Sequence, residues 1–573
     1  MGTISDKLMR IINTKEDIRQ ALISKGYDVP TSIPFKEYAK MILDLPCNAD
    51  SFPDIEGIVA RYSASGLTNE QMAANPVWVD KTGNGHDIQL KNFSWKGMSG
   101  VGGYVADIDE WGTNSTAAYF ERNSIKITAT FKENVSLGLL YHNIKLRQSC
   151  VLKVTGIPEG CDAFLDDRLG NRFYMSEDGV YEIIPSNFLA EALYFSIEKY
   201  PERWYGSKLT IEQPPLYPGA LVFDGVDDYG VCDNFPILTK EKGYTVVVLR
   251  QWDQDFLNTT LTGGLLSTRN YSTGEGVAFE KIESSNKGYW NLGAGGIIDF
   301  AKSPFTWQTS KQYNNVGILK GDKNHGKPLC VGCGLSGGQQ CGRFAIWELV
   351  FLDHDATEEE LTKIKDYFVK TYPWLFPDQA WTVVGKTNED EDRATIANIT
   401  GNGNDLVLSN FGFAEGSGYN EEGEYAGYLV TDGVDDKAVS KQFKFGENFT
   451  VILDFKFPVK KISYCGFDLS SKVRIQNLQG SGVYVVLKGN KTLIPSNVVR
   501  AVTSEGKVYD ENWNEYNIVP GNISSNYTMV NLGFDGSNQF AESATKLAGI
   551  YSSILSKDEC IKAYNYLQTL KSK

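Results

Sequence analysis

Two aspartate pairs could supply carboxylate oxygens to a divalent cation. Asp227 and Asp228 follow an Asp-Gly-Val sequence, and Asp435 and Asp436 follow the same three residues. Calcium takes about six to eight oxygen ligands, more than one such pair offers. Asp-Gly also favours a tight turn whose following carboxylates accept hydrogen bonds from backbone N–H groups. We favour the turn and predict no metal, while the sequence leaves calcium at either pair open.

A second group of residues resembles a zinc site, because Cys-x-x-Cys with two further nitrogen or sulfur ligands can bind zinc tetrahedrally. Its members are His325, Cys330, Cys333 and Cys341. A similar stretch, 530–534, carries Asn531 in place of Cys330 and Phe534 in place of Cys333. Such replacements are typical of cysteines that only pack in a core. The sequence therefore predicts buried cysteines, with no metal and no cofactor.

Residues suited to catalysis are scarce. A laminarinase-type glycoside hydrolase needs two close carboxylates on one strand face. The nearest pair, Asp107 and Asp109, has no counterpart later in the chain, and we interpret it as part of a solvated loop. The run Gly334-Leu-Ser-Gly-Gly338 matches a nucleophile elbow, but its Gly-rich surroundings favour a hairpin. The four histidines, His86, His142, His325 and His354, leave little for acid–base chemistry. We predict a non-enzymatic protein with no catalytic residues.

Aromatic rings on the surface could stack on sugars. Loose candidates are Trp95, Trp111, Trp204, Tyr205 and Trp290. Any of them can equally belong to a core, because the sequence does not show which face of a strand meets solvent. The ligand-binding residues are therefore left open.

The elements that would position these residues occur twice. Lys81-Thr-Gly-Asn-Gly-His-Asp-Ile-Gln-Leu-Lys-Asn-Phe93 returns as Ile399-Thr-Gly-Asn-Gly-Asn-Asp-Leu-Val-Leu-Ser-Asn-Phe411. Likewise, Ala220-Leu-Val-Phe-Asp-Gly-Val-Asp-Asp-Tyr229 returns as Tyr428-Leu-Val-Thr-Asp-Gly-Val-Asp-Asp-Lys437. The first motif recurs after 318 residues and the second after 208, so the first copy holds 110 extra residues. We predict one module present twice, with a small domain inserted into the first copy.

Composition favours a mainly β protein. The 573 residues include 56 glycines and 12% aromatic residues, which suit short strands joined by tight turns. A net charge of −15 would repel phosphate backbones, so we expect no nucleic-acid partner. No apolar run is long enough to span a bilayer, and no secretion signal is found. Nine scattered cysteines suit a reducing cytoplasm, and we expect no membrane partner.

Four parts follow from the pattern along the chain. They are a helical N-terminal module at 1–50, a β-sandwich at 51–112 and 214–376, an inserted β-domain at 113–213, and a second β-sandwich at 377–573. Strands are predicted at matching places of the two copies, at 243–249 and 448–455, then at 344–352 and 547–555. The last strand of each copy runs into a helix with a capping box, at Thr357-x-x-Glu360 and Ser556-x-x-Glu559.

The repeated motifs, with a closing strand and a capped helix, resemble the laminin-G-like, concanavalin A-like lectin superfamily. This resemblance covers residues 55–573 apart from the insertion and implies jelly-roll sandwiches. The segments 13–26 and 34–42 look like N-terminal segments of tail and other virion proteins of tailed bacteriophages. An apolar stripe in the second segment is either a local core or a docking face. The combination is similar to fibre and appendage proteins of phage tails or heads.

The resemblance implies a non-enzymatic virion protein, made in the host bacterial cytoplasm. It would dock to other virion proteins through residues 1–50 and display its sandwiches, which would either bind host-surface or mucosal glycans or serve only as a rigid scaffold. Such fibres are commonly trimers, so a homo-oligomer is expected, although no heptad run specifies one. The alternative is a carbohydrate-active enzyme or its carbohydrate-binding accessory module, which would need the acidic pair that the sequence lacks.

Overall fold

A computed structural model describes residues 52–104 and 201–236 without a break, residues 328–572 with short gaps, and mainly the strands of the ranges between them. Within the first 51 residues it describes only Lys15 and Arg19, both helical, so the predicted N-terminal module lies almost wholly outside the described residues. The chain divides into two compact units, residues 1–55 with 359–367, and the remainder. In the first unit the rings of Phe52 and Tyr367 meet edge to face at 4.9 Å.

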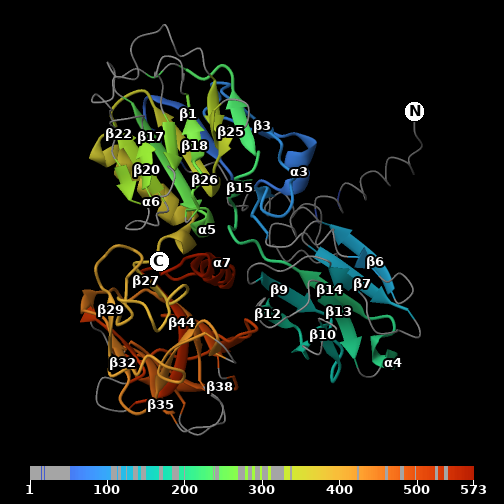
Figure 1. The fold of residues 1–573 in the computed structure, drawn as a ribbon, viewed down its shortest axis with the longest axis vertical. Helices are drawn as coiled ribbons and strands as arrows, with labels where there is room; N and C mark the ends of the chain where they lie inside the picture. Colours follow the sequence, from blue (N-terminus) through green and yellow to red (C-terminus); the bar gives the residue numbers. More distant parts are fainter. Residues whose placement is uncertain are drawn as a thin grey trace. The chain divides into compact units, whose positions relative to one another are not determined.

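The chain is mainly β, as predicted, and its larger sheets pack face to face in pairs (Figure 1). In the first copy, one sheet has the order β22 (Trp307–Lys311), β17 (Thr245–Trp252), β26 (Arg343–Leu352), β15 (Leu221–Asp224) and β4 (Gly100–Val101), with β1 (Ile58–Ser63) also paired to β26. The opposing sheet has the order β2 (Val77–Trp78), β3 (Ile88–Lys91), β16 (Tyr229–Cys232), β23 (Leu329–Val331), β18 (Gly263–Ser267), β19 (Ala278–Lys281), β20 (Lys287–Trp290) and β21 (Ile297–Asp299). The hairpin of β24 (Cys333–Leu335) and β25 (Gln339–Cys341) lies beside β18.

The second copy repeats this order. One sheet runs β30 (Gly418–Asn420), β31 (Tyr428–Asp432), β44 (Glu542–Tyr551), β34 (Thr450–Lys456), β39 (Val498–Thr503), β40 (Lys507–Tyr509) and β41 (Glu515–Asn517), with β27 (Gln379–Thr382) paired to β44. The other runs β28 (Thr395–Ile396), β29 (Leu406–Ser409), β32 (Lys437–Val439), β43 (Val530–Leu532), β35 (Ser463–Leu469), β36 (Val473–Asn477), β37 (Val483–Leu487) and β38 (Asn490–Ile494). The path β4-β15-β26-β17 thus matches β30-β31-β44-β34, and β2-β3-β16-β23-β18 matches β28-β29-β32-β43-β35.

Between β4 and β15 the chain forms two further five-stranded sheets. Their orders are β11 (Arg172–Met175), β10 (Asp162–Asp166), β13 (Leu193–Glu198), β8 (Leu140–His142) and β5 (Gly112–Thr113), and β12 (Gly179–Ile183), β9 (Cys150–Thr155), β14 (Lys208–Glu212), β7 (Lys126–Phe131) and β6 (Ala118–Asn123). Apolar residues of both sheets share one core, which also holds Trp204 of helix α4 (Pro201–Trp204). The exact domain boundaries stay predictions.

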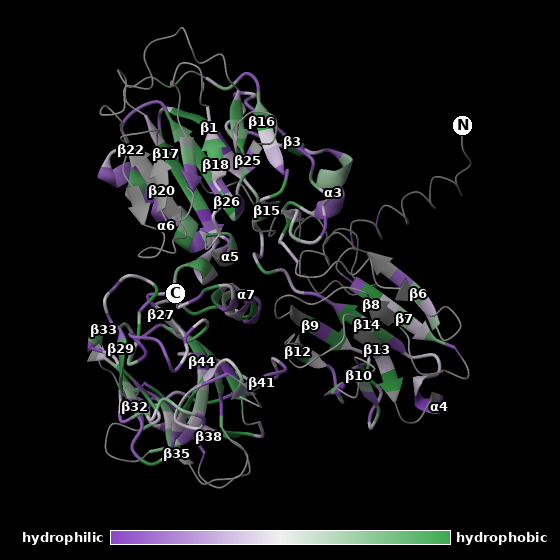
Figure 2. Ribbon diagram, viewed as in Figure 1, coloured by the Kyte–Doolittle hydropathy of each residue, from purple (hydrophilic) through white to green (hydrophobic). Residues whose placement is uncertain are grey.

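The central strands are apolar because both of their faces are covered (Figure 2). All eight residues of β17 are buried, as are nine of the ten residues of β26. Helix α6 (Glu358–Thr371) follows β26, and α7 (Lys557–Gln568) follows β44. The predicted capping box of α7 is confirmed, with Ser556 and Glu559 each accepting from the other's backbone N–H. Among the described helices, none is long and apolar enough to cross a membrane.

Candidate functional site

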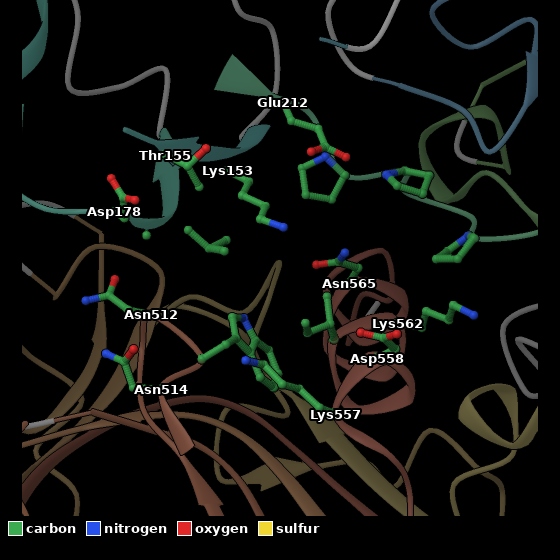
Figure 3. Close-up of a pocket in the computed structure, with 17 residues that line it drawn as sticks. Lys153, Thr155, Asp178, Glu212, Asn512, Asn514, Lys557, Asp558, Lys562 and Asn565 are labelled. Carbon is green, nitrogen blue, oxygen red and sulfur yellow. The ribbon is translucent and has the colours of Figure 1, made fainter. Parts of the chain in front are cut away.

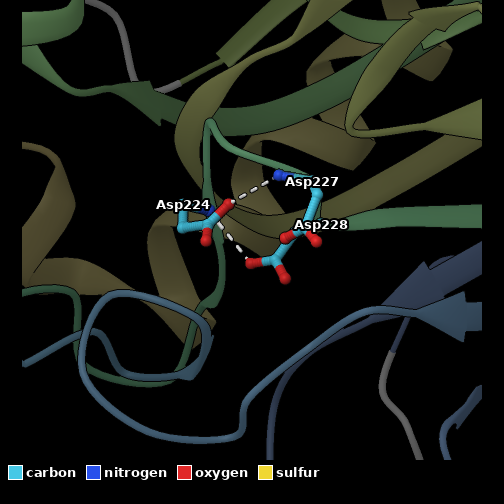
Figure 4. A group of neighbouring side chains, drawn as sticks. All are labelled: Asp224, Asp227 and Asp228. Atoms are coloured by element: carbon cyan, nitrogen blue, oxygen red, sulfur yellow. Dashed lines mark hydrogen bonds between the residues drawn. The ribbon is translucent and has the colours of Figure 1, made fainter. Parts of the chain in front are cut away.

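The aspartates of the first copy form a closed turn between β15 and β16 (Figure 4). Asp224 Oδ1 accepts hydrogen bonds from the backbone N–H groups of Val226 at 2.7 Å and Asp227 at 3.3 Å. Asp228 Oδ2 accepts from the backbone N–H of Asp224 at 3.0 Å. Its other oxygen, Oδ1, accepts from the hydroxyl of Ser99 at 2.9 Å. The carboxylates therefore hold their own turn and fasten it to the chain before β4.

The second copy repeats the turn between β31 and β32 almost bond for bond. Asp432 Oδ1 accepts from the backbone N–H groups of Val434 at 2.8 Å and Asp435 at 3.3 Å. Asp436 Oδ2 accepts from the N–H of Asp432 at 2.9 Å, and its Oδ1 accepts from Ser417 Oγ at 3.1 Å. The repeated sequence is thus explained by one repeated hydrogen-bond pattern.

Two other matching residues complete each turn. Gly225 and Gly433 have φ angles of +76° and +75°, a conformation that favours glycine. The side chains of Asn92 and Asn410 donate to the backbone carbonyl of the exposed aspartate of the turn, at 3.1 and 3.0 Å. These bonds link the first repeated motif to the second in both copies.

Each triad brings three carboxylates within 4.8 Å of one another, which is close enough for them to share a cation. The buried members, however, bind a proton more tightly than an exposed aspartate does. Burial, followed by the nearby charge of Asp224, raises the pKa of Asp228 to about 7. Burial raises the pKa of Asp436 to about 6. Since the carboxylate oxygens already accept bonds from the turn and protonate readily, the contacts support a structural role for both triads.

The cysteines of the zinc-like group are buried, as predicted. Cys330, Cys333 and Cys341 pack together with Tyr229 and Val231 on β23, β24, β25 and β16. The fourth member, His325, lies outside the described residues. A core of cysteine and apolar side chains fits packing better than metal binding.

The groups considered for catalysis are not gathered into a described site. Asp107 and Asp109 lie outside the described residues. Gly334 belongs to β24, which pairs with β25 in the predicted hairpin. His86 accepts a hydrogen bond at its backbone carbonyl from Tyr62, whereas His354 lies beside Asp353 after β26. The remaining two histidines offer no described side chain: His142 is known only as a residue of β8, and His325 falls outside the described residues.

The aromatic candidates for sugar stacking differ in exposure. Trp204 is fully buried in the core of the insertion, and Trp95 is half-buried against the core of the first copy. Tyr205 is 58% exposed and can meet a ligand. Trp111 lies outside the described residues, and Trp290 is described only as the end of β20. The insertion also exposes Tyr119 and Tyr174, which no sequence pattern singled out.

Each copy also buries an ion pair that sequence patterns missed. In the first copy, the guanidinium of Arg61 lies 3.1 Å from the carboxylate of Glu348, which also accepts from the hydroxyl of Tyr372 at 2.8 Å. These residues come from β1, β26 and the chain after α6. Arg61 and Glu348 stand 287 residues apart, so no local spacing reveals their contact.

In the second copy, the buried carboxylate is Asp454 of β34, which pairs with Arg500 of β39. It also accepts from the hydroxyls of Tyr428 at 2.8 Å and Tyr564 at 3.1 Å, and from Gln568 Nε2 at 3.0 Å. Burial acts to raise the pKa of Asp454, but the positive charges nearby hold it below its usual range. This cluster ties α7 to its sheet.

A pocket in the structure is lined by apolar and polar residues, among them Asn512, Asn514 and Lys562 (Figure 3). Asn512 and Asn514 belong to the loop between β40 and β41, and their backbone N–H groups donate to Asp510 Oδ1 at 3.0 and 2.8 Å. Between them, the ring of Trp513 packs edge-on against Tyr564 of α7, with centroids 5.9 Å apart. The carboxylate of Asp510 thus holds the loop between β40 and β41, as the carboxylates of the triads hold their turns.

Comparison with models of protein families and with curated proteins finds no match. Among solved structures, the chain is similar to the binding domain of botulinum neurotoxin serotype D, with 10% identity over 60% of this chain and 89% of that chain, and a TM-score of 0.23. It is similar to Trypanosoma rangeli sialidase in complex with sialic acid, with 10% identity over 78% and 83% of the two chains, and a TM-score of 0.24. A complex of the botulinum neurotoxin serotype D ligand-binding domain with N-acetylneuraminic acid gives 8% identity over 87% and 97%, and a TM-score of 0.24. We draw no functional conclusion from scores this low, and the expected virion family stays a prediction.

Proposed function

We propose that this chain is a non-enzymatic virion protein of a tailed bacteriophage, a fibre or appendage component. It docks to other virion proteins through residues 1–50 and displays its β-sandwiches to host-surface or mucosal glycans. It is made in the host cytoplasm and assembles as a homo-oligomer, with a trimer as the first expectation. The observation that carries the proposal is the combination of an opening segment resembling virion proteins with a duplicated sandwich resembling the lectin superfamily.

The chemistry of the triads supports display rather than catalysis. In both copies the grouped carboxylates accept hydrogen bonds from their own turns. A general acid and base must instead face a substrate with free oxygens. The same closed turn occurs in each copy, which suits a rigid scaffold built twice.

The exposed tyrosines of the insertion are the described rings best placed to stack on a sugar. Tyr174 is 48% exposed, and its neighbour Arg172 on the same face of β11 pairs with Asp166 at 2.9 Å. A ring beside a guanidinium and a carboxylate can combine stacking with hydrogen bonds to sugar hydroxyls. Tyr205 offers a second exposed ring, whereas the ammonium of Lys132 lies over the ring of Tyr119 at 4.4 Å.

Binding of labelled full-length protein to host cells, with and without removal of surface polysaccharide, tests glycan display. We expect saturable binding that depends on the polysaccharide. Tyr174→Ala should weaken it by up to about tenfold, because a stacked ring contributes about 0.5–1.5 kcal/mol. The exposed but non-aromatic Val226 provides a control, since Val226→Ala should bind normally. Equal binding to stripped and untreated cells would overturn the glycan part of the proposal.

A reducing-sugar assay on the same polysaccharide separates display from hydrolysis. We expect no release above background. Release that Asp107→Asn and Asp109→Asn abolish would replace this proposal with the carbohydrate-active enzyme.

A further inference from the structure

Two cysteines stand directly opposite each other in the β24–β25 hairpin. Cys333 pairs with Cys341 in antiparallel register. Next to them, the N–H of Gly342 donates to the carbonyl of Gly332 at 2.9 Å. Because hydrogen-bonded and non-hydrogen-bonded pairs alternate along an antiparallel ladder, the cysteines occupy a non-hydrogen-bonded pair. Their side chains therefore leave the hairpin on the same face.

This position suits a disulfide. Residues of a non-hydrogen-bonded pair have Cα atoms about 4.5 Å apart, and disulfides join Cα atoms about 4.4 to 6.8 Å apart. Both cysteines are buried in one cluster, and each is a thiol in this structure. The register alone therefore places the two Cα atoms within the range that a disulfide spans.

In the second copy, two facing side chains also contact each other at this position of the hairpin. Phe534 and Phe540 face each other in the matching bridge, where the N–H of Ala541 donates to the carbonyl of Gly533 at 2.7 Å. Their rings are stacked, with centroids 6.0 Å apart and planes 22° apart. The aromatic pair closes the second hairpin by contact, and two thiols occupy the same place in the first.

We propose that Cys333 and Cys341 form a redox-sensitive disulfide that closes the β24–β25 hairpin when the protein meets a small-molecule disulfide such as oxidised glutathione. The proposal is independent of the function proposed above. It assigns a covalent modification to residues that packing alone would leave as thiols.

The exchange balances without any further reactant. One cysteine thiolate attacks a sulfur of oxidised glutathione, which forms a mixed disulfide and releases one glutathione thiolate. The second cysteine thiolate then attacks the protein sulfur of the mixed disulfide and releases the second glutathione. The two protein thiols lose two protons and two electrons, and one oxidised glutathione becomes two reduced molecules.

Burial sets the rate of this exchange. Burial, together with the neighbouring Cys333 thiol, raises the pKa of Cys341 to about 12, so its thiolate is rare at neutral pH in the closed hairpin. Exchange should then be fastest during folding or while the hairpin is open. Oxidation of the folded protein should accelerate as pH rises.

Peptide mass mapping of the full-length protein tests the proposal. The protein is refolded with oxidised and reduced glutathione, denatured, alkylated and digested. Chymotrypsin cleavage after Leu335 separates Cys333 from Cys341. We expect the two resulting peptides to be linked, with a mass two hydrogens below the sum of the two thiol peptides, while Cys330, Cys161, Cys465 and Cys560 are alkylated. Reduction with dithiothreitol should remove the link.

Single variants separate this pair from the third thiol of the cluster. Cys330→Ser should keep the link, whereas Cys333→Ser should lose it and leave Cys341 alkylated. The peptide map of the wild-type protein tests the proposal even where a variant fails to fold. Alkylation of both cysteines in refolded wild type, or a link from Cys330 to either one, would overturn the proposal.

Discussion

The two copies use the same strands to bury a carboxylate, but they place it on opposite strands of the pair. In the first copy Glu348 of β26 stands opposite Leu249 of β17. In the second, Asp454 of β34 stands opposite Leu547 of β44, where these strands match β17 and β26. The acid and the leucine have exchanged places. Each acid then finds its own cation, Arg61 in one copy and Arg500 in the other.

The turns show the opposite behaviour. Both copies keep the Asp-Gly-Val-Asp-Asp turn, because its carboxylates and its asparagine partner bond backbone N–H and C=O groups that either copy must satisfy. The serine partner adds a bond between side chains in each copy. Different residues can form a buried side-chain cluster, provided that each charge is paired. Backbone hydrogen bonding thus keeps the turns alike in the two copies, whereas the buried side-chain clusters differ between them.

The largest expected effect comes from breaking one buried pair. Glu348→Leu installs the residue found at the matching place of the second copy, but it removes the carboxylate that pairs with the buried guanidinium of Arg61. We expect a loss of about 3–5 kcal/mol in the free energy of unfolding of the first copy. Hydrogen–deuterium exchange of β26 peptides locates the loss.

The matched control removes both charges. In the aligned strands Ala380 of β27 stands where Arg61 stands in β1. The double variant Arg61→Ala/Glu348→Leu should therefore recover most of the stability lost in the single variant. If the β26 peptides of the single and double variants exchanged hydrogen at equal rates, the unpaired charge of Arg61 would not be the cause of the lost stability.

The second prediction moves the cysteine pair into the other hairpin. Phe534→Cys/Phe540→Cys should form a disulfide under oxidising glutathione, because both hairpins have the same backbone pairing. Oxidation should stabilise this variant by about 2–3 kcal/mol relative to its reduced form, the gain expected for a short closed loop. Urea denaturation with and without dithiothreitol measures the difference. If both introduced cysteines could still be alkylated after oxidation, the two hairpins would differ in backbone pairing.

The third prediction compares aspartates within one turn. Asp224→Ala leaves two backbone N–H groups without their acceptor, so we expect a loss of about 1–3 kcal/mol. Among the described residues, none donates a hydrogen bond to the exposed carboxylate of Asp227, and Asp227→Ala should change stability by less than about 0.5 kcal/mol. Thermal unfolding of both variants, beside Asp432→Ala and Asp435→Ala, provides the test. A similar loss at Asp227 would point to a ligand that needs it.

The fourth prediction concerns pH. The folded pKa of Asp228 is about 7, well above that of an exposed aspartate, so the folded state binds this proton more tightly than the unfolded state. Its contribution to stability is therefore fully present below about pH 4 and is lost as pH rises through about 7. Asp436, with a pKa of about 6, should lose its contribution to stability at a lower pH than Asp228 does.

Melting curves from pH 4 to 8 measure this effect. The wild type should gain stability on acidification relative to Asp228→Asn/Asp436→Asn, which has no group to protonate at these positions. Parallel curves for the two proteins would contradict the assignment.

The smallest expected effect is that of calcium. If the triads serve only their turns, millimolar calcium should leave the melting temperature unchanged in wild type and in Asp227→Ala. A rise that Asp227→Ala and Asp435→Ala abolish would instead establish two bound ions.

Local patterns predicted the parts of this fold that depend on local physics. The repeated motifs indicated a duplicated module, and the predicted strands at 243–249 and 448–455 correspond to β17 and β34. The capping box at Ser556 is confirmed because its two bonds lie within four residues. The predicted burial of Cys330 and Cys333 also followed from comparing one copy with the other.

Long-range pairing could not be read in the same way. The contact of Arg61 with Glu348 depends on strand order, which no local spacing encodes. Trp204 and Tyr205 are neighbours of similar type, yet one is buried and the other exposed, because only the fold decides which ring meets the core. The stacked Phe534 and Phe540 were likewise invisible until the hairpin brought them together.

Immunogold electron microscopy of particles produced by the strain that encodes this chain tests the central claim most directly. An antibody raised against the full-length protein should label the outside of intact phage particles, and the protein should remain with them through density-gradient purification. Unlabelled particles, with the protein found only in the fractions without phage, would contradict a virion role.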